Sequence, residues 1–108
     1  KARLRADLRA AMKSGRMGDA KVLRALVAAL DNAEAQPADA EKASVQHRFG
    51  DGSAEVERRV LSVDDVRRVL LAEVEERERA AVELDGVGQT ERAEGLRAEA
   101  LLARRYLD

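Results

Sequence analysis

The sequence contains no cysteine and almost no aromatic residues. Aromatic side chains make up 2% of the 108 residues and are represented by Phe49 and Tyr106 alone. Without cysteine, neither a disulfide framework nor a thiolate metal site can form. A β-sandwich would use more aromatic and β-branched residues and more turns than this chain offers. The composition therefore argues against a disulfide-rich or an all-β protein.

Proline and long apolar runs are equally scarce. Pro37 is the only proline, and no apolar run approaches the roughly 20 residues needed to cross a bilayer. The first segment, Lys1 to Met12, is basic and amphipathic and lacks the continuous hydrophobic stretch of a signal peptide. We therefore expect a cytoplasmic protein with no membrane contact.

The residues that are present favour helices. Charged residues make up 38% of the chain, and Leu, Val and Ala supply nearly all the apolar material. Such a mixture is typical of long helices. A chain of 108 residues fits one domain, 1–108, with a limited core.

Two stretches of helical periodicity precede Pro37. The first is apolar at Leu4, Leu8, Ala11 and Met12, and it ends before Gly15, a residue suited to the left-handed conformation that terminates helices. The second is expected to begin near Asp19 as its N-cap and to end at Pro37. Its apolar face comprises Val22, Leu23, Leu26, Val27, Leu30 and Ala33.

Two further helical stretches follow residue 60. The third begins at Ser62, which with Asp65 forms a variant of the capping box, and it ends at Gly86 and Gly88. The fourth is expected to be capped by Thr90. The predicted inward positions are Val63, Val66, Leu70, Val74, Ala81 and Leu84 in the third helix, and Ala93, Leu96, Ala100 and Leu107 towards the end of the chain. The pattern predicts an all-α antiparallel bundle of about four main helices.

Residues 37–60 interrupt this pattern between the second and third helices. A turn signal, Phe49-Gly50-Asp51-Gly52-Ser53, lies at the centre. We expect a mobile insertion on the outside of the bundle, either irregular or folded as a hairpin. The only histidine, His47, falls within it and is expected to be an exposed loop residue.

The charges are unevenly divided although the net charge is −1. Residues 1–30 contain eight basic and two acidic residues, a net charge of +6, and the remainder carries −7. Arg9, Lys13 and Arg16 follow i, i+4, i+7 spacing and should share one helix face, where they could contact phosphates. Candidate nucleic-acid-binding residues are Arg5, Arg9, Lys13, Arg16 and Arg24. Alternatively, the opposite charges satisfy each other, within one molecule or through self-association.

No arrangement of residues indicates catalysis. Glu73, Glu76 and Glu83 share one predicted helix, but no Glu-x-x-His pair accompanies them, and no phosphate-binding glycine loop is present. Glu73 with Arg77 and Glu75 with Arg79 are spaced as stabilising i, i+4 ion pairs. We therefore expect a solvated charged face, with no metal, no cofactor and no catalytic residue.

An ordered set of short segments extends over most of the chain outside 36–59. It consists of Asp7 to Lys13, Leu23 to Leu26, Ala28 to Glu34, Leu61 to Val66, Glu73 to Arg77, Gly88, Ala93-Glu94, Glu99 and Tyr106-Leu107. In this order and spacing, the set resembles the YqeY family, which is related to the C-terminal part of the B subunit of glutamyl/aspartyl-tRNA amidotransferase.

The resemblance implies a helical domain associated with glutamine-dependent carbon–nitrogen ligases, whose relatives help to hold tRNA while another domain transfers ammonia. It implies tRNA or an amidotransferase complex as partner and no catalysis by this chain alone. The matching polar positions are Asp7, Lys13, Arg24, Glu34, Arg77 and Glu99. Asp108 stands where the family has proline, and the family's C-terminal tail subdomain is absent. The alternative is a helical protein-interaction module with no nucleic-acid role.

Overall fold

The computed structural model describes residues 2–35 and 60–107, and these form an all-α protein of four helices. The helices are α1 (Ala2–Lys13), α2 (Met17–Ala35), α4 (Val63–Gly86) and α5 (Thr90–Arg104). The prediction of an all-α fold with about four main helices is confirmed. The predicted insertion at 37–60 and its His47 lie outside the described residues, apart from the exposed Val60.

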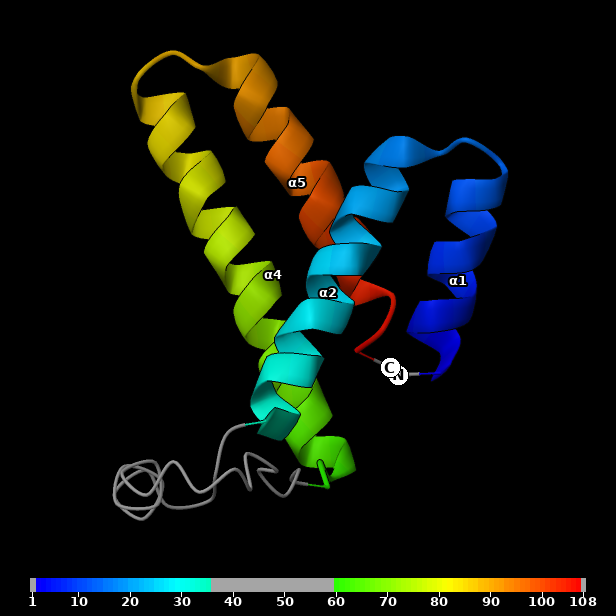
Figure 1. Cartoon of the computed structure of the whole chain (residues 1–108). Coiled ribbons are helices and arrows are strands. Elements are labelled where there is room, and N and C mark those ends of the chain that lie inside the picture. The colour runs from blue at the N-terminus through cyan, green and yellow to red at the C-terminus, as the bar shows by residue number, and fades with distance from the viewer. Residues whose placement is uncertain (1, 36–59, 108) are drawn as a thin grey trace, which may run out of the picture.

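The helices α1 and α2 form the first helical hairpin (Figure 1). Its turn depends on Gly15, whose φ of +78° belongs to the left-handed region that glycine enters at little cost. The prediction of Asp19 as N-cap is wrong, because α2 begins two residues earlier at Met17. Asp19 instead lies in the first turn, where the helix dipole favours a carboxylate.

The helices α4 and α5 form the second hairpin. Ser62 caps α4 as predicted: its hydroxyl accepts a bond from the Asp65 amide at 3.0 Å, and the Asp65 carboxylate accepts one from the Ser62 amide at 3.1 Å. Gly88, with φ of +80°, makes the turn into α5. The prediction of Thr90 as the cap of α5 is wrong, because Gln89 occupies the N-cap position and its side chain makes no capping bond.

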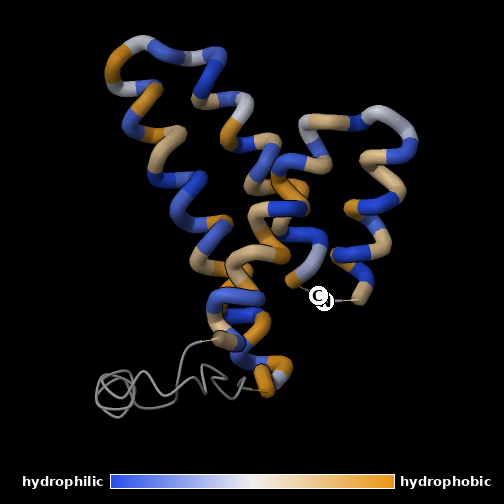
Figure 2. Tube along the Cα trace, in the orientation of Figure 1, coloured by the Kyte–Doolittle hydropathy of each residue, from blue (hydrophilic) through white to orange (hydrophobic). Residues whose placement is uncertain are grey.

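The core lies where α2 crosses α4 and the final turns of α5. Hydrophobic positions gather at this crossing, whereas the far half of the α4–α5 hairpin is mostly hydrophilic (Figure 2). The predicted inward position Val63 is wrong, because it precedes the crossing and is 85% exposed. The buried core residues are Leu4, Ala11, Ala20, Val22, Leu23, Leu26, Leu30, Leu70, Val74, Ala100 and Ala103.

The two hairpins form an open structure in which α2 is the central element. Helix α2 packs against α1, α4 and α5, whereas α1 contacts the second hairpin chiefly through residues that follow α5. The far half of the second hairpin buries small residues, Ala81 and Ala93. The radius of gyration is 16.9 Å, compared with about 13 Å for a compact chain of this length. Much helix surface therefore remains free of intramolecular packing.

None of the helices in the described ranges combines the length and the apolar character required to cross a membrane.

Candidate nucleic-acid interface

One side of the first hairpin is formed by two parallel stripes of side chains. On α1, Arg5, Arg9 and Met12 follow i, i+4, i+7 spacing. On α2, Met17, Lys21, Arg24 and Asp31 follow i, i+4, i+7, i+14 spacing. Residues at these spacings lie on one face of a helix. We call this side, together with Lys13, the outer face.

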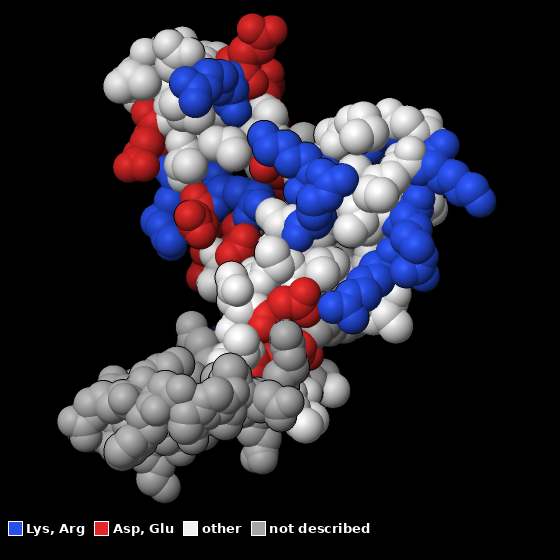
Figure 3. All heavy atoms as spheres, viewed as in Figure 1, with Lys and Arg blue, Asp and Glu red and all other residues white. Residues whose placement is uncertain are grey.

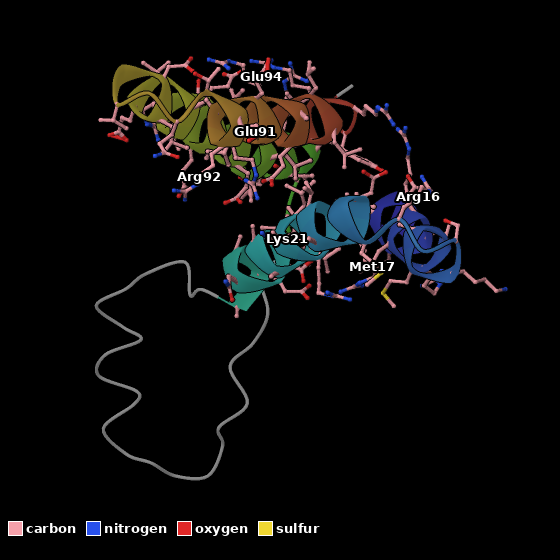
Figure 4. The ribbon with its side chains drawn as sticks, turned by 90° about the horizontal axis from the view of Figure 1, so that it is seen from above. Arg16, Met17, Lys21, Glu91, Arg92 and Glu94 are labelled. Carbon is pink, nitrogen blue, oxygen red and sulfur yellow. The ribbon has the colours of Figure 1, made fainter. Side chains whose placement is uncertain are left out.

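Two contacts between the helices show that both stripes lie on the same side. Arg24 donates from Nη2 to Met12 Sδ at 3.4 Å, and Arg5 Nη2 lies 3.0 Å from Asp31 Oδ1. In Figure 4, Met17 lies on the side of this hairpin away from α4 and α5. The part of the outer face around Met17 and Arg24 is therefore turned away from the second hairpin and open to a partner.

Positive charge dominates the outer face. Arg9, Lys13 and Lys21 are exposed and form no ion pair within the described residues, and the guanidinium of Arg24 bonds only to the neutral sulfur of Met12. Figure 3 shows basic side chains along α1 and the upper part of α2, whereas acidic and basic side chains are mixed over the second hairpin and acidic ones gather at the lower end of α2. These cations are available for an anionic ligand.

The other two predicted cations are already partly neutralised. Arg5 pairs with Asp31, and Arg16 pairs with Asp19 at 3.5 Å and bonds to the Ser14 hydroxyl at 2.9 Å. The expectation that Arg16 shares a helix face with Arg9 and Lys13 is wrong, because α1 ends at Lys13. The turn at Gly15 places Arg16 at the end of the hairpin instead.

Asp7 lies on a different side of α1 and binds the C-terminal segment. The Tyr106 hydroxyl donates to Asp7 Oδ2 at 2.6 Å, and the Arg3 guanidinium lies 4.9 Å from the centre of the Tyr106 ring. Arg67 donates to the Leu107 carbonyl and holds the same segment against α4. Asp7 thus connects α1 to the segment after α5, which is a structural role.

Burial, followed by the hydrogen bond to Asp7 and its negative charge, raises the pKa of Tyr106 to about 12 from a usual value of 10.0. Because Tyr106 is the only tyrosine, ultraviolet absorbance of the phenolate reports this group alone. We expect a midpoint near pH 12 in the folded protein and near pH 10 in denaturant. Asp7→Asn should lower the folded midpoint part of the way, since burial remains. A folded midpoint equal to the denatured one would contradict the contact.

The same pKa shift predicts a pH dependence of stability. A phenol whose folded pKa is raised stabilises the fold fully below pH 10.0, and this contribution is lost as the pH rises towards about 12. The difference in unfolding free energy between wild type and Tyr106→Phe should therefore shrink across that window.

Arg77 and Glu99 form an ion-pair network with Glu73. The Arg77 guanidinium, 14% exposed, lies 3.1 Å from Glu73 Oε1 and 3.2 Å from Glu99 Oε1. This confirms the predicted Glu73–Arg77 pair, whereas Glu75 and Arg79 form no ion pair in the part of the chain described. The network joins α4 to α5.

The remaining carboxylates do not gather into a site. Glu76 and Glu83 are exposed on α4. Glu34 lies half-buried near the end of α2, where its side chain interacts with another group. Within residues 2–35 and 60–107, no group of three or more His, Cys, Asp or Glu side chains could hold a metal ion.

Three residues of the outer face, Met12, Met17 and Lys21, were not predicted from the sequence as surface-binding residues. Lys21 shares a stripe with Arg24, and Met12 and Met17 are 44% and 58% exposed between the cations. The i, i+4, i+7 spacing of Met17, Lys21 and Arg24, opposite the apolar face of α2, was a signal for the second stripe. Met12 was assigned to the buried face because it borders it. Among the basic residues of the outer face, Lys21 alone was not predicted.

Fold and surface together define a class: a small all-α protein of two helical hairpins with a basic outer face on the first. Comparisons of the chain with protein-family models, curated proteins and solved structures found no match.

Proposed function

We propose that this chain is a non-catalytic, cytoplasmic helical domain of the YqeY type that helps tRNA, or a tRNA-dependent amidotransferase carrying tRNA, to bind. The observation that carries the proposal is the set of cations on the outer face, Arg9, Lys13, Lys21 and Arg24, with no carboxylate partner in the described structure. Unpaired Lys and Arg side chains release counterions when they meet phosphates, which is the main source of non-specific nucleic-acid affinity.

The resemblance supports the tRNA part of this proposal. Five of its six matching positions, all but Glu34, divide into two groups in the structure. Lys13 and Arg24 contribute to the outer face, whereas Asp7, Arg77 and Glu99 hold the helices together. The first group would bind phosphate, and the second would keep the hairpins in the geometry that presents it. The amide transfer of the related enzymes belongs to another domain, so the proposal assigns no chemical step to this chain.

A tRNA titration at several salt concentrations tests the proposal. If about four phosphates are neutralised, the logarithm of the association constant should fall against the logarithm of salt concentration with a slope of about −3 to −4. Arg9→Glu/Lys13→Glu should weaken binding at low salt on the order of 10–100-fold, because two cations become repulsive charges. Fluorescence anisotropy with labelled tRNA measures both quantities.

A matched control separates local contacts from total charge. Arg79→Glu/Arg92→Glu changes the net charge by the same amount on the second hairpin, where neither arginine forms an ion pair in the described structure. This control should retain most of the affinity. No binding at low salt, or equal losses in the two double variants, would remove the proposal.

A protein-interaction module is the second candidate, and one observation favours it. Val82 and Leu101, on the second hairpin, are 68% and 67% exposed. Docking of a protein partner through apolar helix surface should depend only weakly on salt, in contrast to tRNA binding. A partner complex that tolerates high salt and is lost in Val82→Asp/Leu101→Asp would support this candidate.

A further inference from the structure

We infer that the outer face binds the phosphate backbone of double-helical RNA rather than the bases of a single strand. The inference rests on the proposed function and narrows its ligand: on a folded RNA, the contacted region would be a stem. Four properties of the structure support it, namely the placement of the aromatic residues, the arrangement of the cations, the exposed methionines and the distribution of negative charge.

Tyr106, the aromatic residue among those the structure describes, contacts Asp7 and Arg3 and does not lie on the outer face. Single-strand binders stack bases on aromatic side chains. Tyr106 has one ring face beneath the Arg3 guanidinium, and its hydroxyl donates to Asp7, on a different side of α1 from Arg9 and Met12. The only other aromatic residue, Phe49, lies outside the described residues. The outer face itself therefore contains no platform on which unpaired bases could stack.

The cations of the outer face form two rows, one on each of the packed helices α1 and α2. Arg9 and Lys13 are about 6 Å apart along α1, given a rise of about 1.5 Å per residue. Lys21 and Arg24 form the second row on α2, and packed helix axes lie about 8–10 Å apart. A double helix presents phosphates over a surface, so a two-row array can meet several at once, whereas a flexible single strand would pay ordering entropy to do so. Duplex RNA is recognised mainly through shape and through phosphate and 2′-hydroxyl contacts.

Met12 and Met17 fit the same ligand. Both are exposed on the outer face, and Met12 is held against Arg24. Methionine is flexible and apolar and adapts to irregular surfaces. The wide, shallow minor groove of RNA presents sugar edges that such side chains can cover between neighbouring phosphate contacts.

Negative charge on the second hairpin orients the ligand. Glu91 and Glu94, in the first turns of α5, are exposed and form no ion pair among residues 2–35 and 60–107. Figure 4 shows Glu94 on the side of α5 that faces away from α2 and the first hairpin. Residues 60–107 contain eleven acidic and eight basic residues, so a polyanion meets a net negative charge on the second hairpin and a net positive charge on the outer face, which favours binding in one orientation.

The test compares three labelled RNAs by fluorescence anisotropy at low salt: a blunt duplex of about 16 base pairs, oligouridine of the same length, and tRNA. We expect the dissociation constant of the duplex to be at least about 10-fold lower than that of oligouridine. Arg9→Glu/Lys13→Glu and, independently, Lys21→Glu should weaken duplex binding, whereas Arg79→Glu/Arg92→Glu should leave it largely unchanged. Circular dichroism verifies that each variant is folded.

The outcomes separate this inference from the proposed function. Oligouridine binding as tight as duplex binding overturns the preference for a double helix, and if tRNA still binds through Arg9 and Lys13 the proposed function survives. Duplex binding that Lys21→Glu leaves unchanged overturns the two-row arrangement. If none of the RNAs binds at low salt, both proposals fail together.

Discussion

Leu26→Ala should destabilise this protein by about 3 kcal/mol, within the range of about 2–5 kcal/mol seen when a buried leucine is truncated. Leu26 is fully buried in the core cluster. It lies on α2, the helix through which the first hairpin packs against the second. Truncation removes apolar contacts and leaves a cavity that the surrounding helices fill only in part. For a domain of this size, the melting temperature should fall on the order of 10–20 °C.

Leu101→Ala is the matched control, because the same atoms are removed from a side chain that is 67% exposed. Its unfolding free energy should change by less than about 0.5 kcal/mol. Urea denaturation followed by circular dichroism measures both variants. Equal effects at the two positions would mean that α2 does not occupy the core described above.

Arg77→Met should cost about 2–3 kcal/mol. The substitution keeps an unbranched apolar stem but leaves Glu73 and Glu99 close together without the cation between them. Removing one partner of a fully buried ion pair typically costs about 3–5 kcal/mol. A smaller loss is expected here, because the Glu73 and Glu99 side chains retain 25% and 29% exposure and water screens them in part.

A rescue experiment distinguishes lost charge balance from lost packing. Adding Glu73→Gln and Glu99→Gln to Arg77→Met removes the repulsion and should recover a large part of the lost stability. Arg79→Met serves as the control, since Arg79 is exposed and forms no ion pair in the described structure, and it should change stability by less than about 0.5 kcal/mol. Failure of the rescue would assign the loss to the Arg77 stem rather than to its charge.

The helices and several of their boundaries followed from local chemistry in the sequence. Gly15 and Gly88 adopt the left-handed conformation that ends a helix, and the Ser62–Asp65 capping box forms as its spacing predicts. The caps proposed at Asp19 and Thr90 were wrong by three residues and by one residue, because α2 begins at Met17 and Gln89 is the N-cap of α5. A good capping residue also tolerates the first turn, so residue type alone does not fix where a helix begins.

The candidate interface was predicted only in part. Spacing along one helix identified Arg9 and Lys13, because a helical stripe is a property of local sequence. It could not show that Lys21 and Arg24 continue the same surface, since that depends on how α2 rotates against α1. Nor could it show that Asp31 would pair with Arg5, across 26 positions in the chain.

The sequence by itself determined the helical character, the two tight turns and the excess of positive charge in the first third, because each depends on residues close together in the chain. Only the tertiary structure decided which cations remain unpaired and which polar residues form hydrogen bonds or ion pairs between helices. Asp7 meets Tyr106 across 99 positions, and Arg77 meets Glu99 across 22. Such pairings arise when the packing of α2 against its neighbours brings distant helices together, which no local pattern encodes.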